Sequence, residues 1–267
     1  MPDLIAPDKM DSESSSALPQ SLSVSVSKQA GNRLIVALDV PTSDAALALA
    51  ERLEGQCDWF KVGLELYIAA GPTIVEKLVG RGHSIFLDLK LHDIPNTVAA
   101  AVRSTTSLGV RMLTIHASGG PAMLAAAREA AAGMATPLQL LAVTVLTSMD
   151  QSQLAATGVP RSAQEQAALL ARMGMDAGID GFVCSPQEVS ALRALTGQAG
   201  VLVTPGIRPA GADKGDQQRI ATPAQALRQG ASYLVVGRPI TQAVDPARAA
   251  EAILREISEA LAETQGA

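Results

Sequence analysis

Aromatic residues are scarce in this chain, at 2% of its 267 residues, and the formal net charge is −5. Surfaces that bind nucleic acid combine basic stripes with aromatic side chains on which bases stack. The sequence has neither feature, so we expect no nucleic-acid partner. No apolar run approaches the roughly 20 residues that a membrane-spanning helix needs, and we expect no membrane partner.

Cysteine and histidine are also sparse, with two and three residues respectively. Cys57 and Cys184 lack paired spacing, which predicts buried, inert thiols in a reducing, cytoplasmic compartment. The three histidines, His83, His92 and His116, do not have the spacing of zinc ligands. We therefore expect no metal site.

The first 30 residues form a serine-rich segment with four acidic residues and no arginine. Such a segment cannot bury enough surface to order itself, so we expect residues 1–30 to be disordered. A transit peptide would be rich in arginine and poor in acidic residues, which this segment is not. The chain is 48% hydrophobic, and we expect residues 31–267 to form a single domain.

Short apolar or β-branched runs alternate with helical segments from Arg33 onward. This alternation indicates βαβ units and a parallel sheet, and eight such units predict an α/β fold closed into a (β/α)8 TIM barrel. A doubly wound open sheet is the competing fold, but it would normally carry a Gly-x-Gly-x-x-Gly turn after its first strand, where this chain has Asp39-Val-Pro-Thr. The expected strands are residues 34–38, 59–63, 84–91, 112–116, 138–146, 181–184, 201–204 and 232–236. The expected helices are residues 42–53, 73–79, 99–108, 121–132, 163–173, one starting at 186, and 246–261, with a short extra helix before residue 163.

From Ile85 to Leu91 the third expected strand is apolar except for Asp88 and Lys90, and Asp93 follows just beyond its end. Asp88 and Lys90 are two residues apart, so on a strand they project from the same face. A structural ion-pair network would explain these charges, and such networks are common. We favour a functional site because the charges gather at the C-terminal end of the strand, where parallel α/β folds place their sites.

In a barrel the C-terminal ends of all strands converge on one face. We expect an alternating array of charges on one side of this face, formed by Asp39, Lys61, Asp88, Lys90 and Asp93. The carboxylates would keep both lysines protonated, since opposite charge favours the charged form. A rigid, protonated lysine is a proton donor, whereas a Schiff-base lysine must be neutral in an apolar pocket.

The loops after the seventh and eighth strands are where barrels commonly bind phosphate. Gly237 offers an unobstructed backbone N–H, and Arg238 could pair with a phosphate in a bidentate manner. Residues 210–218 are polar and contain glycine, which predicts a mobile lid over the ligand. The alternative is an ordinary solvated loop with a surface arginine.

Other polar residues at this face are harder to interpret. Thr147 and Ser148 close the fifth strand. His116 ends the fourth strand without a partner motif, so we expect a hydrogen-bonded scaffold residue rather than a catalyst. Glu65 and Tyr67 lie near the end of the second strand and have no assigned role.

The chain resembles a known family over nearly all of residues 34–261. The segment Asp88-Leu-Lys-Leu-His-Asp-Ile-Pro-Asn-Thr97 is similar to the signature of orotidine 5′-phosphate decarboxylase in its bacterial form. This long motif is highly specific, whereas its Asp-x-Lys-x-x-Asp core alone is much less so. Further matches follow in the family's order: Ala-Leu-Asp39, Lys61-Val-Gly63, Leu146-Thr-Ser148, Thr204-Pro-Gly-Ile-Arg208-Pro and Gly237-Arg238-Pro.

The resemblance implies an enzyme that converts orotidine 5′-monophosphate to uridine 5′-monophosphate and carbon dioxide, in the last step of de novo pyrimidine synthesis. It implies no metal and no organic cofactor. By resemblance, Lys90 delivers a proton to C6 and Asp88 sits beside the substrate carboxylate. Asp39 and Lys61 would contact the ribose hydroxyls, and Thr147 the base.

The resemblance also implies the ligands of the phosphate, which are Arg208, Gln217, Gly237 and Arg238. It implies a homodimer with shared active sites, in which Asp93 and Thr97 reach into the site of the neighbouring subunit.

Two other functions remain open. Magnesium-dependent sugar-phosphate decarboxylases and hexulose-phosphate synthases of the same superfamily share the short core, with an acidic residue at the end of the second strand. This chain has Lys61 there, which would repel a divalent ion. A non-catalytic, phosphate-binding regulatory barrel would not need Lys90 between Asp88 and Asp93.

Overall fold

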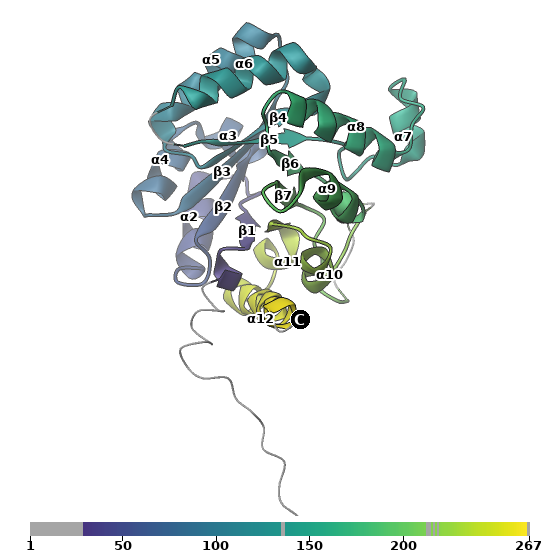
Figure 1. Ribbon diagram of the computed structural model, residues 1–267. Helices are drawn as coiled ribbons and strands as arrows, with labels where there is room; N and C mark the ends of the chain where they lie inside the picture. Colours follow the sequence, from purple (N-terminus) through teal and green to yellow (C-terminus); the bar gives the residue numbers. More distant parts are fainter. Residues whose placement is uncertain (1–28, 135–136, 212–214, 216, 218, 266–267) are drawn as a thin grey trace, which may run out of the picture.

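Eight parallel strands form a closed barrel in which each strand pairs with its neighbours in sequence and β8 pairs with β1 (Figure 1). The structure is a computed structural model that describes residues 29–134, 137–211, 215, 217 and 219–265. The strands are Leu34–Ala37 (β1), Trp59–Gly63 (β2), Ser84–Leu91 (β3), Met112–His116 (β4), Gln139–Val143 (β5), Gly181–Val183 (β6), Val201–Thr204 (β7) and Tyr233–Val236 (β8). The predicted (β/α)8 barrel is therefore confirmed.

Helices follow the strands and surround the barrel (Figure 1). They are Ser43–Arg52 (α2), Leu64–Ala70 (α3), Thr73–Gly80 (α4), Pro95–Ser104 (α5), Pro121–Ala132 (α6), Gln151–Ala156 (α7), Ala163–Asp176 (α8), Val189–Thr196 (α9), Pro223–Arg228 (α10), Arg238–Thr241 (α11) and Pro246–Gln265 (α12). Among the described residues, the connections also contain three short 3-10 helices, Thr105–Leu108 (η1), Ala117–Gly119 (η2) and Pro186–Glu188 (η3).

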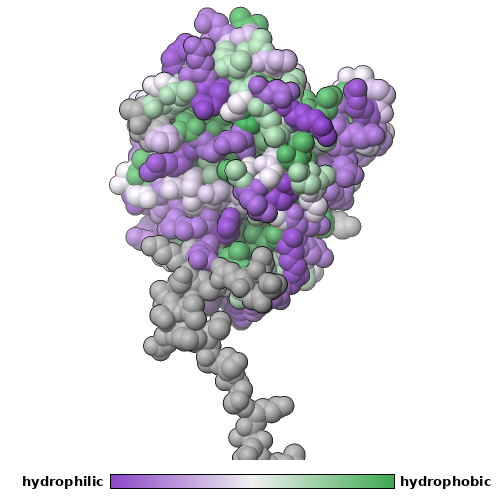
Figure 2. Space-filling view, in the orientation of Figure 1, coloured by the Kyte–Doolittle hydropathy of each residue, from purple (hydrophilic) through white to green (hydrophobic). Residues whose placement is uncertain are grey.

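The sequence prediction missed three short helices, α3, α10 and α11. Helix α3 starts directly after Gly63 and has no side-chain cap, so it carries little local signal. Helix α10 does carry one, because Thr222 and Gln225 form a capping box ahead of it. The short extra helix expected before residue 163 is α7, which projects from the barrel (Figure 1). Hydrophilic residues cover much of this projection in Figure 2.

Alternation along the strands divides the core into two layers. Leu34 and Val36 of β1 belong to the large layer between barrel and helices, while Ile35 and Ala37 point into the barrel. The inner layer consists of Ile35, Ala37, Phe86, Met112, Leu141, Val203 and Val235. The barrel is thus filled by side chains, and a ligand can bind only at its ends.

Both cysteines are buried, as predicted. Burial raises the pKa of the Cys57 thiol and of the Cys184 thiol to about 12 each. Because the thiolate is the reactive form, both thiols are inert at neutral pH.

The predicted disorder of residues 1–30 falls almost entirely outside the described residues. At its boundary, Ala30 is fully buried in the outer core layer. Within the part of the chain that is described, no helix combines the length and apolar character needed to cross a membrane.

Candidate active site

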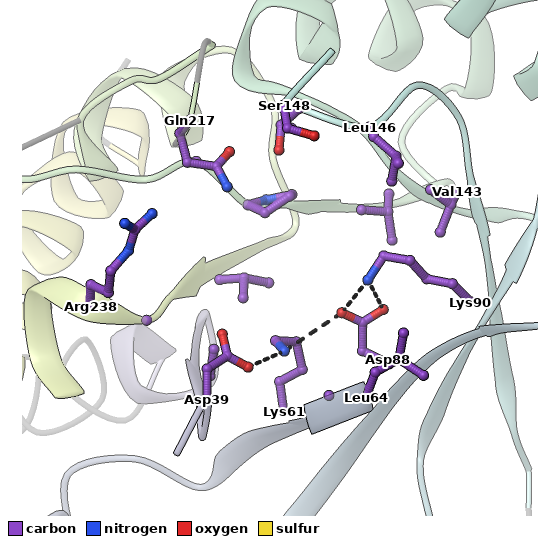
Figure 3. A pocket seen from close by; sticks show the side chains of 18 of the residues that line it. Asp39, Lys61, Leu64, Asp88, Lys90, Val143, Leu146, Ser148, Gln217 and Arg238 are labelled. Carbon is purple, nitrogen blue, oxygen red and sulfur yellow. Dashed lines mark hydrogen bonds and ion pairs between the residues drawn. The ribbon is translucent and has the colours of Figure 1, made fainter. Parts of the chain in front are cut away.

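A cavity of about 560 Å³ opens at the C-terminal ends of the strands (Figure 3). Figure 3 shows Lys90 and Arg238 on opposite sides of this cavity. The cavity brings together all the predicted site residues except Asp93 and Thr97. Its lining includes Asp39, Lys61, Asp88, Lys90, Thr147, Arg208, Gln217, Gly237 and Arg238.

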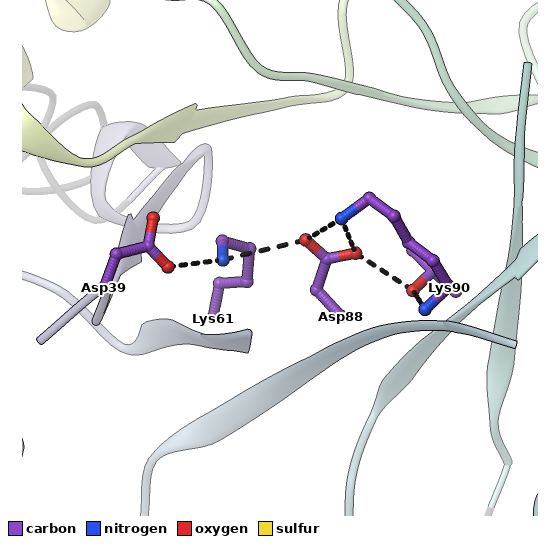
Figure 4. Close-up of polar contacts among 5 residues, drawn as sticks. Asp39, Lys61, Asp88 and Lys90 are labelled. Atoms are coloured by element: carbon purple, nitrogen blue, oxygen red, sulfur yellow. Dashed lines mark hydrogen bonds and ion pairs between the residues drawn. The ribbon is translucent and has the colours of Figure 1, made fainter. Parts of the chain in front are cut away.

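Four charged side chains form a continuous alternating array along one side of the cavity (Figure 4). The Nζ atom of Lys61 lies 2.8 Å from Oδ1 of Asp39 and 3.6 Å from Oδ2 of Asp88. The Nζ atom of Lys90 lies 2.9 and 2.8 Å from the two carboxylate oxygens of Asp88. Asp88 is therefore held between two ammonium groups.

The array is buried in its middle and open at its ends. Lys61 and Asp88 are each 8% exposed, while the side chains of Lys90 and Asp39 are 30% and 51% exposed. A buried charge is costly unless it is paired, and both buried members have partners of opposite sign. The open ends leave one carboxylate and one ammonium group accessible to a ligand.

The pKa of Asp88 reflects two opposing effects. Burial alone would raise this pKa, because it disfavours the charged form. The charges of Lys61 and Lys90, with hydrogen bonds from Lys90 and Thr114, outweigh burial and hold the pKa below its ordinary value. Asp88 is therefore an anion at neutral pH.

Lys90 occupies an irregular backbone position that the sequence analysis did not anticipate. The pairing of β3 with β4 shifts register between Leu87 and Leu91, and Lys90 has φ 51°, the one positive value at a non-glycine residue in the described segments. Bulges re-aim side chains beside active sites, and a strained backbone of this kind costs on the order of 1–3 kcal/mol. At this backbone position the Lys90 ammonium group lies against the Asp88 carboxylate.

Thr114 of β4 stabilises this irregular segment and was missed by the sequence analysis. Its hydroxyl accepts a hydrogen bond from the Lys90 backbone N–H at 2.8 Å and donates one to Oδ1 of Asp88 at 3.0 Å. It is fully buried. Its signal in the sequence is a polar residue in the middle of the strand, between the apolar Leu113 and Ile115.

Gly63 at the end of β2 makes room for the array. A Cβ atom at this position would lie 2.8 Å from Nζ of Lys61 and 3.2 Å from Oδ1 of Asp39. The first distance is shorter than van der Waals contact, so a larger residue would displace the lysine.

The cavity lining also includes two arginines, and Arg238 lies on the side opposite Lys90 (Figure 3). Arg208, after β7, is buried, and its Nη1 atom donates to the carbonyl oxygen of Ile207 at 2.8 Å. Arg238 starts α11 directly after Gly237 and is exposed. With Gln217, these arginines add cationic groups and hydrogen-bond donors to the cavity lining.

The predicted lid, residues 210–218, lies partly outside the described residues, which omit 212–214, 216 and 218. The base of this segment is closed by a parallel bridge between Ile207 and Ala221. The backbone N–H of Arg208 donates to the carbonyl oxygen of Ala221 at 2.9 Å.

Asp93 and Thr97 do not join the site of their own chain. Both are exposed, and neither lines the cavity. The carboxylate of Asp93 accepts a hydrogen bond from the backbone N–H of Ile94 at 2.7 Å, just before α5. The predicted five-membered array therefore has four members in the single chain, because β3 ends before Asp93 and the chain turns away.

Three residues that the sequence left without a catalytic role can now be placed. The ring of His116 packs against that of His92, with centroids 5.4 Å apart. Among the described residues, the His116 side chain makes no hydrogen bond, so His116 is not the hydrogen-bonded scaffold residue that we expected. Burial, followed by the charges of His92 and Lys90, lowers the pKa of His116 against the opposing effect of Asp88. Glu65 lines the cavity, and Tyr67 packs against the outer core layer.

The described residues contain no group of three or more histidine, cysteine or acidic side chains that could hold a metal ion. Lys61 lies between the two nearest carboxylates of the site, Asp39 and Asp88.

The fold and the site together define a (β/α)8-barrel protein with a charged, ligand-sized cavity at its strand ends. Residues 32–253 match the sequence model of the orotidine 5′-phosphate decarboxylase / HUMPS family, and the chain belongs to this family. The resemblance seen in the motifs is thus confirmed.

Relatives with curated names agree with this assignment. The chain is 53% identical over 234 residues to the orotidine 5′-phosphate decarboxylase of Moorella thermoacetica, covering 85% of this chain and 93% of that protein. It is 53% identical over 228 residues to the protein of the same name from Nitrosococcus oceani, covering 85% and 98%. The crystal structure of orotidine 5′-phosphate decarboxylase from Lactobacillus acidophilus is 40% identical, with a TM-score of 0.74 over 85% of this chain and 99% of that chain.

Proposed function

We propose that this protein decarboxylates orotidine 5′-monophosphate to uridine 5′-monophosphate and carbon dioxide, in the last step of de novo pyrimidine synthesis in the cytoplasm. The observation that carries the proposal is the Asp–Lys–Asp–Lys array on one side of a cavity whose other side is cationic. A volume of about 560 Å³ is in the range of small-molecule sites. A nucleotide with its base at Lys90 and its phosphate at Arg238 fits this division of charge.

Lys90 is the proposed proton donor. Loss of carbon dioxide from C6 of the base leaves a carbanion that has no electron sink within the substrate. An ammonium group held in place beforehand stabilises that charge electrostatically and then supplies the proton. The pairing of Lys90 with Asp88, and the hydrogen bond from its backbone to Thr114, support this role because they fix the position of the ammonium group.

Asp88 is proposed to lie beside the carboxylate of the substrate. Its lowered pKa keeps it charged at neutral pH. The Asp88 carboxylate and the substrate carboxylate would therefore repel each other while the substrate is bound, and this repulsion would end once carbon dioxide has left. This repulsion would raise the energy of the ground state relative to the transition state. Binding energy from the remote phosphate offsets the repulsion.

The remaining polar residues are proposed to bind the parts of the nucleotide that do not react. Asp39 and Lys61 would contact the ribose hydroxyls, and Thr147 the base. Arg208, Gln217, Gly237 and Arg238 would hold the phosphate. Their places in the cavity support this division, since all of them line it, Asp39 and Lys61 belong to the array, and Arg238 lies on the side opposite Lys90.

The proposed active form is a homodimer with shared sites. Asp93 and Thr97 lie outside the cavity of their own chain and are exposed, which leaves them accessible to a second copy. The neighbouring Ile94 and the α3 residue Ile68 are large apolar side chains with most of their surface exposed. Burial of these two side chains against a second copy would remove apolar surface from water, which favours association.

The direct test is an absorbance assay with orotidine 5′-monophosphate, run with and without excess EDTA. We expect turnover that survives chelation, because Lys61 occupies the position where a divalent ion would need an anion. Activity lost in EDTA and restored by magnesium would favour the sugar-phosphate branch of the superfamily. Binding of uridine 5′-monophosphate without any turnover would favour the regulatory barrel.

A further inference from the structure

A second buried ion pair lies next to the cavity, between residues that the sequence analysis did not single out. Arg219, in the segment between β7 and α10, is 7% exposed, and Glu188, the last residue of η3, is 1% exposed. Nη1 of Arg219 is paired with Oε1 of Glu188. Neither residue lines the cavity, so neither is expected to touch the ligand.

Arg219 also binds the loop that follows β5. Its Nη2 atom donates to the carbonyl oxygen of Leu146 at 2.8 Å, with the carbonyl oxygen of Val145 at 3.3 Å. These carbonyls directly precede Thr147 and Ser148, which line the cavity. One guanidinium group therefore holds the backbone on which the base-side residues are carried.

Glu188 anchors this arginine to the end of β6. Its second carboxylate oxygen, Oε2, accepts a hydrogen bond from the backbone N–H of Ser185 at 2.9 Å. The carboxylate is thus fixed on η3 by a capping box before it pairs with Arg219. The position of the guanidinium group is set by the barrel itself and not by a flexible partner.

The backbone of Arg219 belongs to the phosphate side of the cavity. It follows Gln217 by two residues and precedes Ala221, which bridges to Ile207. Packing at this point is tight, because Gly206 has φ 79° and a Cβ atom there would lie 2.6 Å from the carbonyl oxygen of Arg219. The side chain and the backbone of Arg219 therefore belong to two different sides of the cavity.

Stability alone does not account for this arrangement. Apolar residues of similar volume often replace a buried ion pair at no cost in stability. An apolar side chain would fill the space, but it could not bind the two carbonyl oxygens and the carboxylate that fix the direction of the guanidinium group. What the arginine adds is a defined geometry between the loop after β5 and the segment after β7.

We propose that Arg219, with Glu188 as its counter-ion, is a positioning residue that sets the separation between the base-side loop and the phosphate-side segment. The base-side loop carries Thr147, and the phosphate-side segment carries Gln217. The inference rests on the proposed function, because it needs a ligand with a base at one end and a phosphate at the other. A ligand that spans both ends depends on this separation, whereas a ligand that occupies the base side alone does not.

The base side has further attachments that should survive loss of the arginine. The backbone N–H of Thr144 donates to the carbonyl oxygen of Val183 at 3.2 Å, and the N–H of Met149 donates to that of Leu146 at 3.0 Å. Loss of Arg219 should therefore disturb mainly the segment that carries Gln217. The effect should be selective for ligands that have a phosphate.

The test compares uridine 5′-monophosphate with uridine in Arg219→Met, Arg219→Lys and Glu188→Gln proteins. Arg228→Met is the matched control, because Arg228 forms an exposed ion pair with Glu263. Calorimetry gives both affinities, turnover of orotidine 5′-monophosphate gives KM and kcat, and thermal unfolding gives Tm. Every measurement is made well below the Tm of the variant.

In Arg219→Met we expect the affinity for uridine to stay within about twofold of wild type. The affinity for uridine 5′-monophosphate should fall, and the KM for orotidine 5′-monophosphate should rise, each by about 10- to 100-fold, which is the range that a displaced positioning contact can produce. Arg219→Lys should recover part of the loss, and Arg228→Met should match wild type. Equal losses for both ligands, or a lower Tm with both affinities unchanged, would overturn the proposal. If Arg219→Met does not fold, the same comparison of uridine 5′-monophosphate affinity with uridine affinity in Arg219→Lys and Glu188→Gln tests the proposal.

The wild-type protein separates this inference from the one on which it rests. Absence of turnover in wild type is a failure of the proposed function. If the wild type turns over substrate but the variants change their affinities for uridine 5′-monophosphate and for uridine equally, the positioning role alone has failed.

Discussion

Lys90 and Asp88 form a close ion pair within one strand, with Nζ 2.8 and 2.9 Å from the two carboxylate oxygens, although the backbone of Lys90 is in the left-handed region. A lysine rarely adopts φ 51° unless the surrounding structure holds it there. Here the holding contacts are the hydrogen bonds of Thr114 to both residues. The site therefore combines a strained backbone with a fixed ammonium group, as expected of a preorganised proton donor.

Gly63 provides a test of the array that alters no charged residue. Gly63→Ala should push the Lys61 ammonium group away from Asp39, since the added Cβ would lie 2.8 Å from Nζ. We expect turnover to fall by about 10- to 100-fold in a folded protein. Gly80→Ala, at an exposed position with no atom within 4 Å of the added Cβ, is the control and should match wild type. Full activity in Gly63→Ala would mean that the array tolerates displacement of Lys61.

Asp88 should give the protein a specific loss of stability in acid. Its folded-state pKa is lower than the ordinary value of 3.8. The ionised carboxylate therefore stabilises the fold above that pH, and this contribution is lost as the pH falls through the folded-state pKa. Asp88→Asn should lower the free energy of unfolding near pH 7 by about 3–5 kcal/mol, the range for breaking a buried pair.

Urea unfolding of wild type and Asp88→Asn between pH 7 and pH 3 measures this contribution. The difference between the two proteins should narrow as the pH falls below about 4. Asp176→Asn, on the exposed surface of α8, should show no such trend. A difference that stays constant or widens in acid would contradict the lowered pKa.

Arg238→Ala should weaken nucleotide binding. Loss of a charge-assisted contact to phosphate typically costs about 1.5–3 kcal/mol, so affinity for uridine 5′-monophosphate and kcat/KM should fall by at least tenfold. Affinity for uridine should change little. The exposed Arg228→Ala is the control. Unchanged nucleotide affinity in Arg238→Ala would place the phosphate elsewhere.

The proposed shared-site dimer predicts complementation between two inactive variants, Lys90→Ala and Asp93→Ala. In a mixed dimer both changes fall on one site and leave the other intact. Random mixing gives about half mixed dimers, so activity should approach roughly a quarter of wild type if the subunits exchange and pair symmetrically. Mass spectrometry would establish that mixed dimers are present.

A mixture of Lys90→Ala with Asp88→Ala is the matched control for complementation. These two residues belong to one array in one chain, so every site of the mixed dimer carries a defect and no activity should return. Mixed dimers of Lys90→Ala and Asp93→Ala that remain as inactive as this control would show that Asp93 serves its own subunit.

Local sequence patterns were enough to predict the architecture and most of the lining of the site. Apolar periodicity and turn residues are local features, and they predicted all eight strands within a few residues of their observed ends. Because parallel strands of a barrel end on one face, the residues that follow them could be grouped without a structure. Asp39, Lys61, Asp88, Lys90 and Arg238 were found in this way.

The contacts among these residues depend on packing between distant parts of the chain, which local patterns do not reveal. The irregular backbone at Lys90 depends on how β3 pairs with β4. The limited space at Gly63 depends on the positions of Lys61 and Asp39. Asp93 lies outside the array because the chain turns into α5. Arg219 and Glu188 are 31 positions apart in the sequence and carry no shared motif. Their pairing depends on the closure of the barrel, since contacts between distant segments are set by packing and not by local propensity.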